Sequence, residues 1–276
     1  MYGDTGYVEQ TEPDYKARSY YWKTAIGLQQ VDGLTPSGYL IDTANANIAG
    51  QISLNEAERL IAEYYEQKPA ATDAEKHGEE ADKVSLHIAQ ALAGNTFKLA
   101  PTELLSIHRL LFDGVFEHAG KIRDCNLSKR EWVLDGKSVV YDDFRAVRAS
   151  LDYDFDRENA FEHSGSDARA EVGHIAKFIS GLWQIHAFRE GNTRAIAVFT
   201  IKYLRAFGYD ITNDTFEKNS LFFRNALVRA NYNDHKNGVT ATREFLDQFF
   251  GNLLFGEKNE LKNRKLRISE QSSEPL

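Results

Sequence analysis

Apolar residues recur every three to four positions through most of the chain, which is the pattern of amphipathic helices packed around a core. One such stripe contains Ala57, Leu60, Ile61 and Tyr64 and follows Ser53, a residue type that caps helix N-termini. The pattern predicts an all-α fold. Helices are expected at about 20–30, 35–49, 53–67, 84–93, 102–111, 144–158, 167–185, 192–207, 216–232 and 240–255.

The segment 132–141 does not follow this helical period. Two β-prone runs flank Asp135 and Gly136, a dipeptide that favours the tight turn of a hairpin. The sequence therefore predicts one β-hairpin within an otherwise helical fold.

Changes in composition divide the chain into four parts. Residues 1–68 are predicted to form a small helical module, with a polar, loosely ordered leader over 1–20. Residues 69–80 lack large apolar side chains and are interpreted as a linker. The main helical domain is expected over 81–255, and a polar, frayed tail over 256–276.

The charge balance narrows the class of protein. The sequence has 276 residues, with 33 basic and 41 acidic side chains and a net charge of -8. This excess of acidic groups argues against a nucleic-acid partner, because neutralising phosphates requires Lys and Arg. No signal peptide is recognisable, and no apolar run approaches the ~20 residues of a membrane span. With Cys125 as the only cysteine, we expect a cytoplasmic protein with no membrane partner.

One short segment combines residues that suit phosphate chemistry. Free N–H groups at a helix start, approached closely because Gly191 has no side chain, would make an anion site. Arg194 adds donors for phosphate oxygens, and Glu190 is a hard oxygen ligand for a nucleotide's Mg²⁺. His186 can accept a proton near neutral pH. The whole segment is His186-Ala187-Phe188-Arg189-Glu190-Gly191-Asn192-Thr193-Arg194.

This segment resembles the signature loop of Fic-domain proteins, of the Fic/Doc superfamily. The positions that match are His186, Phe188, Glu190, Gly191, Asn192 and Arg194. The similarity extends to 119–129, which resembles the segment leading into the family's flap hairpin, and to 104–111, where the first helix of the Fic core falls. It covers about residues 80–250, so the resemblance implies a Fic-type helical core whose flap is the predicted hairpin.

The resemblance also implies an activity, that of a nucleotidyltransferase moving AMP from ATP to a hydroxyl of a target protein. It makes His186 the general base and Glu190 the ligand of Mg²⁺. The implied phosphate-binding residues are Gly191, Asn192, Thr193 and Arg194. The implied flap residues, which would dock the target protein by strand addition, are Ser138, Val139, Val140 and Tyr141.

The chain departs from the family pattern at four positions. Thr193 stands where the commonest loop has a second glycine, Ala197 where it has a further arginine, and Ala187 where it usually has proline. These changes leave two alternatives open: phosphotransfer to a protein, as in the Doc branch, or a nucleotide-sensing module with little transfer activity. The segment 45–50 resembles the end of the family's inhibitory helix, but Ala49 stands at the position of its glutamate. The N-terminal module is then structural, or the restraint is absent, altered or supplied by an inhibitory partner chain.

Several residues with suggestive chemistry are interpreted as structural. A lone histidine on a helix usually belongs to the packing, which is the interpretation for His87, His108 and His174. The aromatic residues Phe222, Phe223 and Tyr232 are expected in the core rather than against an adenine ring.

Overall fold

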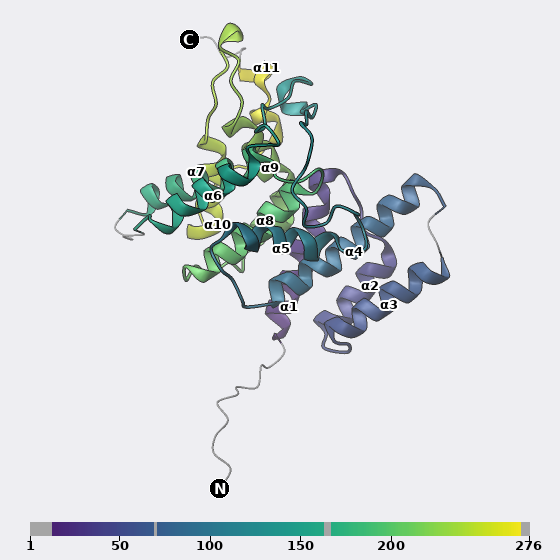
Figure 1. The fold of residues 1–276 in the computed structure, drawn as a ribbon. Helices are drawn as coiled ribbons and strands as arrows, with labels where there is room; N and C mark the ends of the chain where they lie inside the picture. Colours follow the sequence, from purple (N-terminus) through teal and green to yellow (C-terminus); the bar gives the residue numbers. More distant parts are fainter. Residues whose placement is uncertain (1–12, 69–70, 163–166, 272–276) are drawn as a thin grey trace.

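The computed structural model describes residues 13–68, 71–162 and 167–271, and helices joined by loops make up its regular structure (Figure 1). The described part contains no β-strand, only one isolated bridge between Asp234 and Val239. The prediction of an all-α fold is confirmed. The helices are α1 (Tyr15–Leu28), α2 (Gly38–Ile48), α3 (Leu54–Gln67), α4 (Asp73–Ala93), α5 (Pro101–Phe112), α6 (Val147–Asn159), α7 (Ala168–Ile185), α8 (Asn192–Ala206), α9 (Thr215–Ala230), α10 (Glu244–Phe255) and α11 (Ile268–Gln271), with short 3-10 turns η1 (Gln29–Asp32), η2 (Trp132–Leu134), η3 (His235–Asn237) and η4 (Asn263–Leu266).

Local sequence explains where the N-terminal helices begin. The side chains of Asp14, Ser37 and Ser53 each accept a hydrogen bond from a backbone N–H in the first turn of α1, α2 and α3. Thr72 and Glu75 form a reciprocal capping box at the start of α4.

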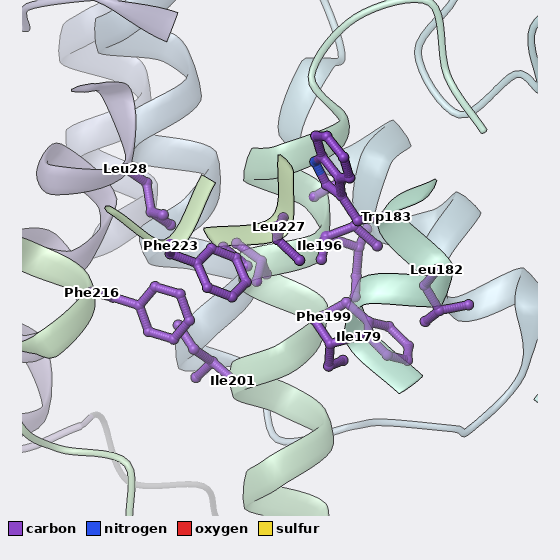
Figure 2. Packing of buried hydrophobic residues seen from close by; sticks show 14 of the residues in the cluster. Leu28, Ile179, Leu182, Trp183, Ile196, Phe199, Ile201, Phe216, Phe223 and Leu227 are labelled. Atoms are coloured by element: carbon purple, nitrogen blue, oxygen red, sulfur yellow. The ribbon is translucent and has the colours of Figure 1, made fainter. Parts of the chain in front are cut away.

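Helix α8 is the centre of the molecule. Every residue from 192 to 204 is buried, which is the burial of a helix surrounded by others rather than of one lying at the surface. It packs against α4, α5 and α7, and Figure 2 shows apolar side chains of α1, α7, α8 and α9 meeting around it. Labelled there are Leu28, Ile179, Leu182, Trp183, Ile196, Phe199, Ile201, Phe216, Phe223 and Leu227.

Helix α1 belongs to this same core. It packs against α4 and α9. At Gly27 the backbones of α1 and α9 come so close that a Cβ there would overlap the Glu217 backbone. Ser220 of α9 donates a hydrogen bond to the Gly27 oxygen at 2.6 Å. The turn η1 that follows α1 is thereby carried to the start of α8, where the predicted chemistry lies.

The structure corrects three predicted boundaries. The linker predicted at 69–80 is wrong from Asp73 onward, because α4 begins there behind its capping box. The leader predicted over 1–20 ends sooner, since α1 begins at Tyr15, and residues 1–12 lie outside the described part. The tail predicted as frayed over 256–276 packs in its described portion, where Leu266 is fully buried against α9.

The predicted β-hairpin flap is wrong as well. Val133 and Leu134 are both fully buried, so neighbouring side chains point into the protein instead of alternating as in a strand. The chain winds there into η2, and Asp135 and Gly136 both take positive φ, at 51° and 85°. The turn forms where it was expected, but no ladder of strand hydrogen bonds extends from it.

Among the described helices, none is both long and apolar enough to cross a lipid bilayer.

Candidate active site

The loop between α7 and α8 carries the segment predicted to hold the chemistry. Two of its residues take a positive φ, His186 at 52° and Gly191 at 74°. A positive φ is uncommon for a residue with a Cβ, and it persists only where the surroundings enforce it. The backbone at His186 therefore needs support from elsewhere in the fold.

The buried side chain of Arg123 provides that support. Its Nε donates to the His186 carbonyl oxygen at 2.6 Å. Its Nη1 donates to the Cys125 oxygen at 2.7 Å, and its Nη2 donates to the Asp142 oxygen. One guanidinium thus ties the loop to both ends of the segment that contains the predicted flap.

The imidazole of His186 is arranged as a neutral acceptor. Its Nδ1 lies 3.4 Å from the Trp183 carbonyl oxygen, and because a carbonyl only accepts, Nδ1 carries the proton of this bond. Nε2 has no hydrogen-bond partner among the residues that the structure describes. Burial lowers the pKa of His186 to about 3, and the nearby charges of Lys129 and Arg224 act in the same direction.

The four residues predicted as flap form no strand, and one of them, Tyr141, lies beside this imidazole. Tyr141 stacks on His186 with ring centroids 3.8 Å apart, and Val139 is buried. Ser138 donates its hydroxyl to the Val139 oxygen at 2.8 Å. Val140 is 81% exposed, so this segment is anchored on both sides of one apolar side chain that faces outward.

Two side chains hold the turn from Phe188 to Asn192. The Asn192 amide spans it, accepting the Phe188 N–H at 2.9 Å and donating to the Phe188 oxygen at 2.8 Å. His108 of α5 stacks on the Phe188 ring at 3.7 Å, and its Nε2 lies 3.0 Å from the Glu190 oxygen. Its Nδ1 accepts the Gly120 N–H at 2.9 Å, which leaves the proton on Nε2. The sequence assigned His108 only to packing, because nothing in its own helix shows which loop it contacts.

Gly191 is required by its surroundings as well as by its conformation. Its φ of 74° lies in the left-handed region, and a Cβ there would overlap the ring of Phe112 on α5. The sequence predicted that an anion could approach the backbone at Gly191 closely. The structure shows that the Phe112 ring of the core also approaches it closely.

A small pocket opens at the N-terminus of α8. The N–H groups of Gly191, Asn192 and Thr193 have no hydrogen-bond partner among the described residues, as expected at the start of a helix. The pocket has a volume of about 10 Å³, enough for one water molecule. The side chains around it include Asp32, Lys129, Glu131, His186, Glu190 and Arg224.

Arg194, predicted to bind phosphate, does not line this pocket. Its guanidinium is fully buried and lies 2.9 Å from Asp32 and 2.8 Å from Glu80. It also donates to the Gln29 amide oxygen at 3.3 Å and sits 4.8 Å above the Phe112 ring. Its charge therefore joins α8 to η1 and α4.

Glu190, the predicted magnesium ligand, does line the pocket, with its carboxylate half exposed. The Lys129 ammonium lies 3.7 Å from it and 3.6 Å from the Asp32 carboxylate. No group of three or more metal-binding side chains forms within the described residues. Because Mg²⁺ usually takes one or two carboxylates and fills its shell with phosphate oxygens and water, Glu190 fits an ion that arrives with a nucleotide.

Four charged residues that line the pocket were not predicted as site residues: Asp32, Lys129, Glu131 and Arg224. Arg224 of α9 contacts Glu131, with Nη2 at 3.0 Å from Oε1 and at 2.7 Å from Oε2. Burial raises the pKa of Glu131, and Arg224 opposes that shift. No sequence pattern links these two residues, because they lie 93 positions apart.

Residues 98–204, which run from α5 through α6, α7 and the loop to most of α8, match the model of the Fic/DOC family. This part of the chain is a Fic domain. The resemblance to Fic-domain proteins inferred from the loop residues is confirmed.

Two solved structures are similar to this chain. One is the N-terminal FIC domain of Bep8, a VirB-translocated effector protein from Bartonella sp. 1-1C, with a TM-score of 0.53, 18% identity, and coverage of 67% of this chain and 88% of that one. The other is BepC from Bartonella tribocorum, an effector of the same kind with bound AMPPNP, with a TM-score of 0.51, 17% identity and the same coverage. At such identities the likeness concerns the fold. No curated protein matches the chain.

Proposed function

We propose that this Fic protein transfers AMP from ATP to a hydroxyl side chain of a target protein, with His186 as the general base. One observation carries the proposal: His186, whose Nε2 is unprotonated, lines the same pocket as Gly191, Asn192 and Thr193, whose N–H groups are unpaired. An acceptor for a proton and a site for phosphate oxygens are the two parts that this reaction requires.

In the proposed reaction, Nε2 of His186 takes the proton of the target hydroxyl. The hydroxyl oxygen bonds to the α-phosphorus, and the bond between the α- and β-phosphates breaks to release pyrophosphate. The N–H groups at Gly191, Asn192 and Thr193 would stabilise negative charge on the phosphate oxygens. Mg²⁺, with Glu190 as its protein ligand, would neutralise phosphate charge.

Asn192 and Arg194 shape the anion site in this proposal. The Asn192 amide closes the turn onto Phe188, and Arg194 fixes the first turn of α8 to Asp32 and Glu80. Their side chains thereby set the direction of the N–H groups that would face phosphate.

The low pKa of His186 describes the site without a nucleotide. Phosphate charges beside the imidazole would oppose those of Lys129 and Arg224, and so they would favour the protonated ring. The pKa would then move upward, toward the range in which a general base works near neutral pH.

The target protein is proposed to dock along 138–141. Tyr141 keeps this segment against His186, and the exposed Val140 offers an apolar contact at the edge of the site. ATP as donor is supported by the AMPPNP bound to BepC, and use of ATP suits the expected cytoplasmic location.

Labelled nucleotides test the proposal directly. Host lysate is incubated with the protein and ATP labelled at either the α- or the γ-phosphate, with His186→Ala as control. Label from the α-position should reach a protein band, and the variant should lose it. Transfer of γ-label alone would replace AMP transfer by phosphotransfer of the Doc type. Nucleotide binding without any transfer would make the chain a sensing module.

A further inference from the structure

Arg224 is the guanidinium that faces the anion pocket. Its side chain is buried, yet it borders the same small space as His186 and the free N–H groups of α8. Only Nη2 has a partner, the carboxylate of Glu131, and Nε and Nη1 have none among the described residues. Donors that are held in place and left unused point to a ligand that would engage them.

Glu131 occupies the place where such a ligand would bind. It is 1% exposed, and its Oε2, although 2.7 Å from Arg224, makes no hydrogen bond of good geometry. Burying a carboxylate costs free energy when one of its oxygens has no good hydrogen bond. The cost suggests that Arg224, the charge opposite it, has a further role. Phosphate offers Arg224 the same charge and more acceptor oxygens, and a guanidinium binds it through two parallel bonds.

Arg194, the other arginine near the site, cannot bind phosphate in the pocket in the arrangement observed. Asp32, Glu80 and Gln29 surround the guanidinium of Arg194, which lies outside the pocket. Lys129, by contrast, stands at the pocket beside Glu190. The cationic side of the pocket is therefore formed by Lys129 and Arg224.

We propose that Arg224 binds the terminal phosphates of the nucleotide, and that Glu131 holds its guanidinium when no nucleotide is bound. The assignment rests on the proposed use of ATP. The free space beside Arg224 is about 10 Å³, so in this proposal the terminal phosphates would take the place of the Glu131 carboxylate at the guanidinium. Nucleotide and Glu131 thus compete for one guanidinium.

Calorimetry on the full chain with AMPPNP and Mg²⁺, and separately with AMP, tests this competition. Glu131→Gln removes the competing charge and should tighten AMPPNP binding several-fold. The double variant Glu131→Gln/Arg224→Gln keeps a neutral pair in place and should bind AMPPNP about 10- to 100-fold more weakly than Glu131→Gln, as loss of a charged hydrogen bond predicts. AMP, which lacks the terminal phosphates, should respond much less in both variants.

A matched control is Glu158→Gln, which alters a buried carboxylate that does not line the pocket. It should leave AMPPNP affinity unchanged, and melting curves confirm that each variant is folded. If the wild-type chain binds AMPPNP while Glu131→Gln binds it no more tightly and the double variant binds it equally well, the pair is structural and the inference alone fails. If the wild-type chain binds no nucleotide, the proposed function fails with it.

Discussion

His108 and Glu190 are joined by a contact of 3.0 Å between the ring Nε2 and the backbone oxygen, across 82 positions of the sequence. Since burial lowers the pKa of His108 to about 4, the ring is neutral at pH 7 and donates through Nε2 alone. The same ring stacks on Phe188. A core histidine of α5 therefore fixes the position of the loop that carries Glu190, the predicted magnesium ligand.

His108→Phe should slow AMP transfer while leaving the protein folded. The new ring can still stack on Phe188, but the Gly120 N–H and the Glu190 oxygen lose their partner. We expect the labelling rate to fall about 10- to 100-fold, the range for a slightly displaced catalytic loop. The free energy of unfolding should fall by about 1–3 kcal/mol, the cost of unpaired buried groups.

The control for this variant is His87→Phe. His87 also contacts a backbone oxygen, that of Leu111 at 3.0 Å, but it has no contact with the loop. It should cost stability without slowing transfer beyond the loss of folded protein. Equal transfer rates in the two variants would show that His108 has no positioning role.

Gly191→Ala should destabilise the protein through two separate effects. The positive φ costs about 1–2 kcal/mol for a residue with a Cβ, and the overlap with the Phe112 ring adds the strain of displacing a core side chain. Gly136→Ala isolates the first effect, since Gly136 has a φ of 85° and nothing within 4 Å of its Cβ position. Urea denaturation should show the larger loss at Gly191, and equal losses would remove the role given to Phe112.

The sequence predicted well whatever depends on neighbours along the chain. The period of apolar residues located α6 to α10 within a few positions, and the loop from His186 to Arg194 is a local motif whose residues were read in order. The hairpin prediction failed because turn chemistry at Asp135 and Gly136 says nothing of how deeply Val133 and Leu134 are buried.

The features that were missed all join distant parts of the chain. The sequence placed Arg194 at the phosphate, but it did not reveal that α1 and η1 would bring the Asp32 carboxylate to its guanidinium. Likewise, the contact of Arg224 with Glu131 depends on how α9 packs, which no local pattern records. Local chemistry was therefore predictable, and the partners of the charged groups were not.

Arg194→Gln should unfold or strongly destabilise the protein before any effect on phosphate binding can be seen. The change leaves Asp32 and Glu80 facing each other without the guanidinium between them. Breaking a buried ion pair from one side costs about 3–5 kcal/mol. Arg194→Gln/Asp32→Asn/Glu80→Gln, which neutralises all three groups, should recover much of the loss in thermal denaturation. A singly substituted protein as stable as the wild type would contradict the structural role of Arg194.

The free energy of unfolding should depend on pH through the two buried histidines of the site. Burial lowers the pKa of His108 to about 4 and that of His186 to about 3, from an ordinary value of 6.5. At a pH between the folded and the unfolded pKa of each histidine, the unfolded chain binds a proton that the folded chain does not. The stabilisation is therefore complete above pH 6.5 and is lost as the pH falls toward 4, by at most about 1.4 kcal/mol per pH unit for each histidine. Urea denaturation between pH 4 and 7 should show a shallower slope for His108→Gln than for the wild type, because carboxylate contributions are common to both proteins. Parallel slopes would mean that His108 titrates normally in the folded protein and is not buried as a neutral ring.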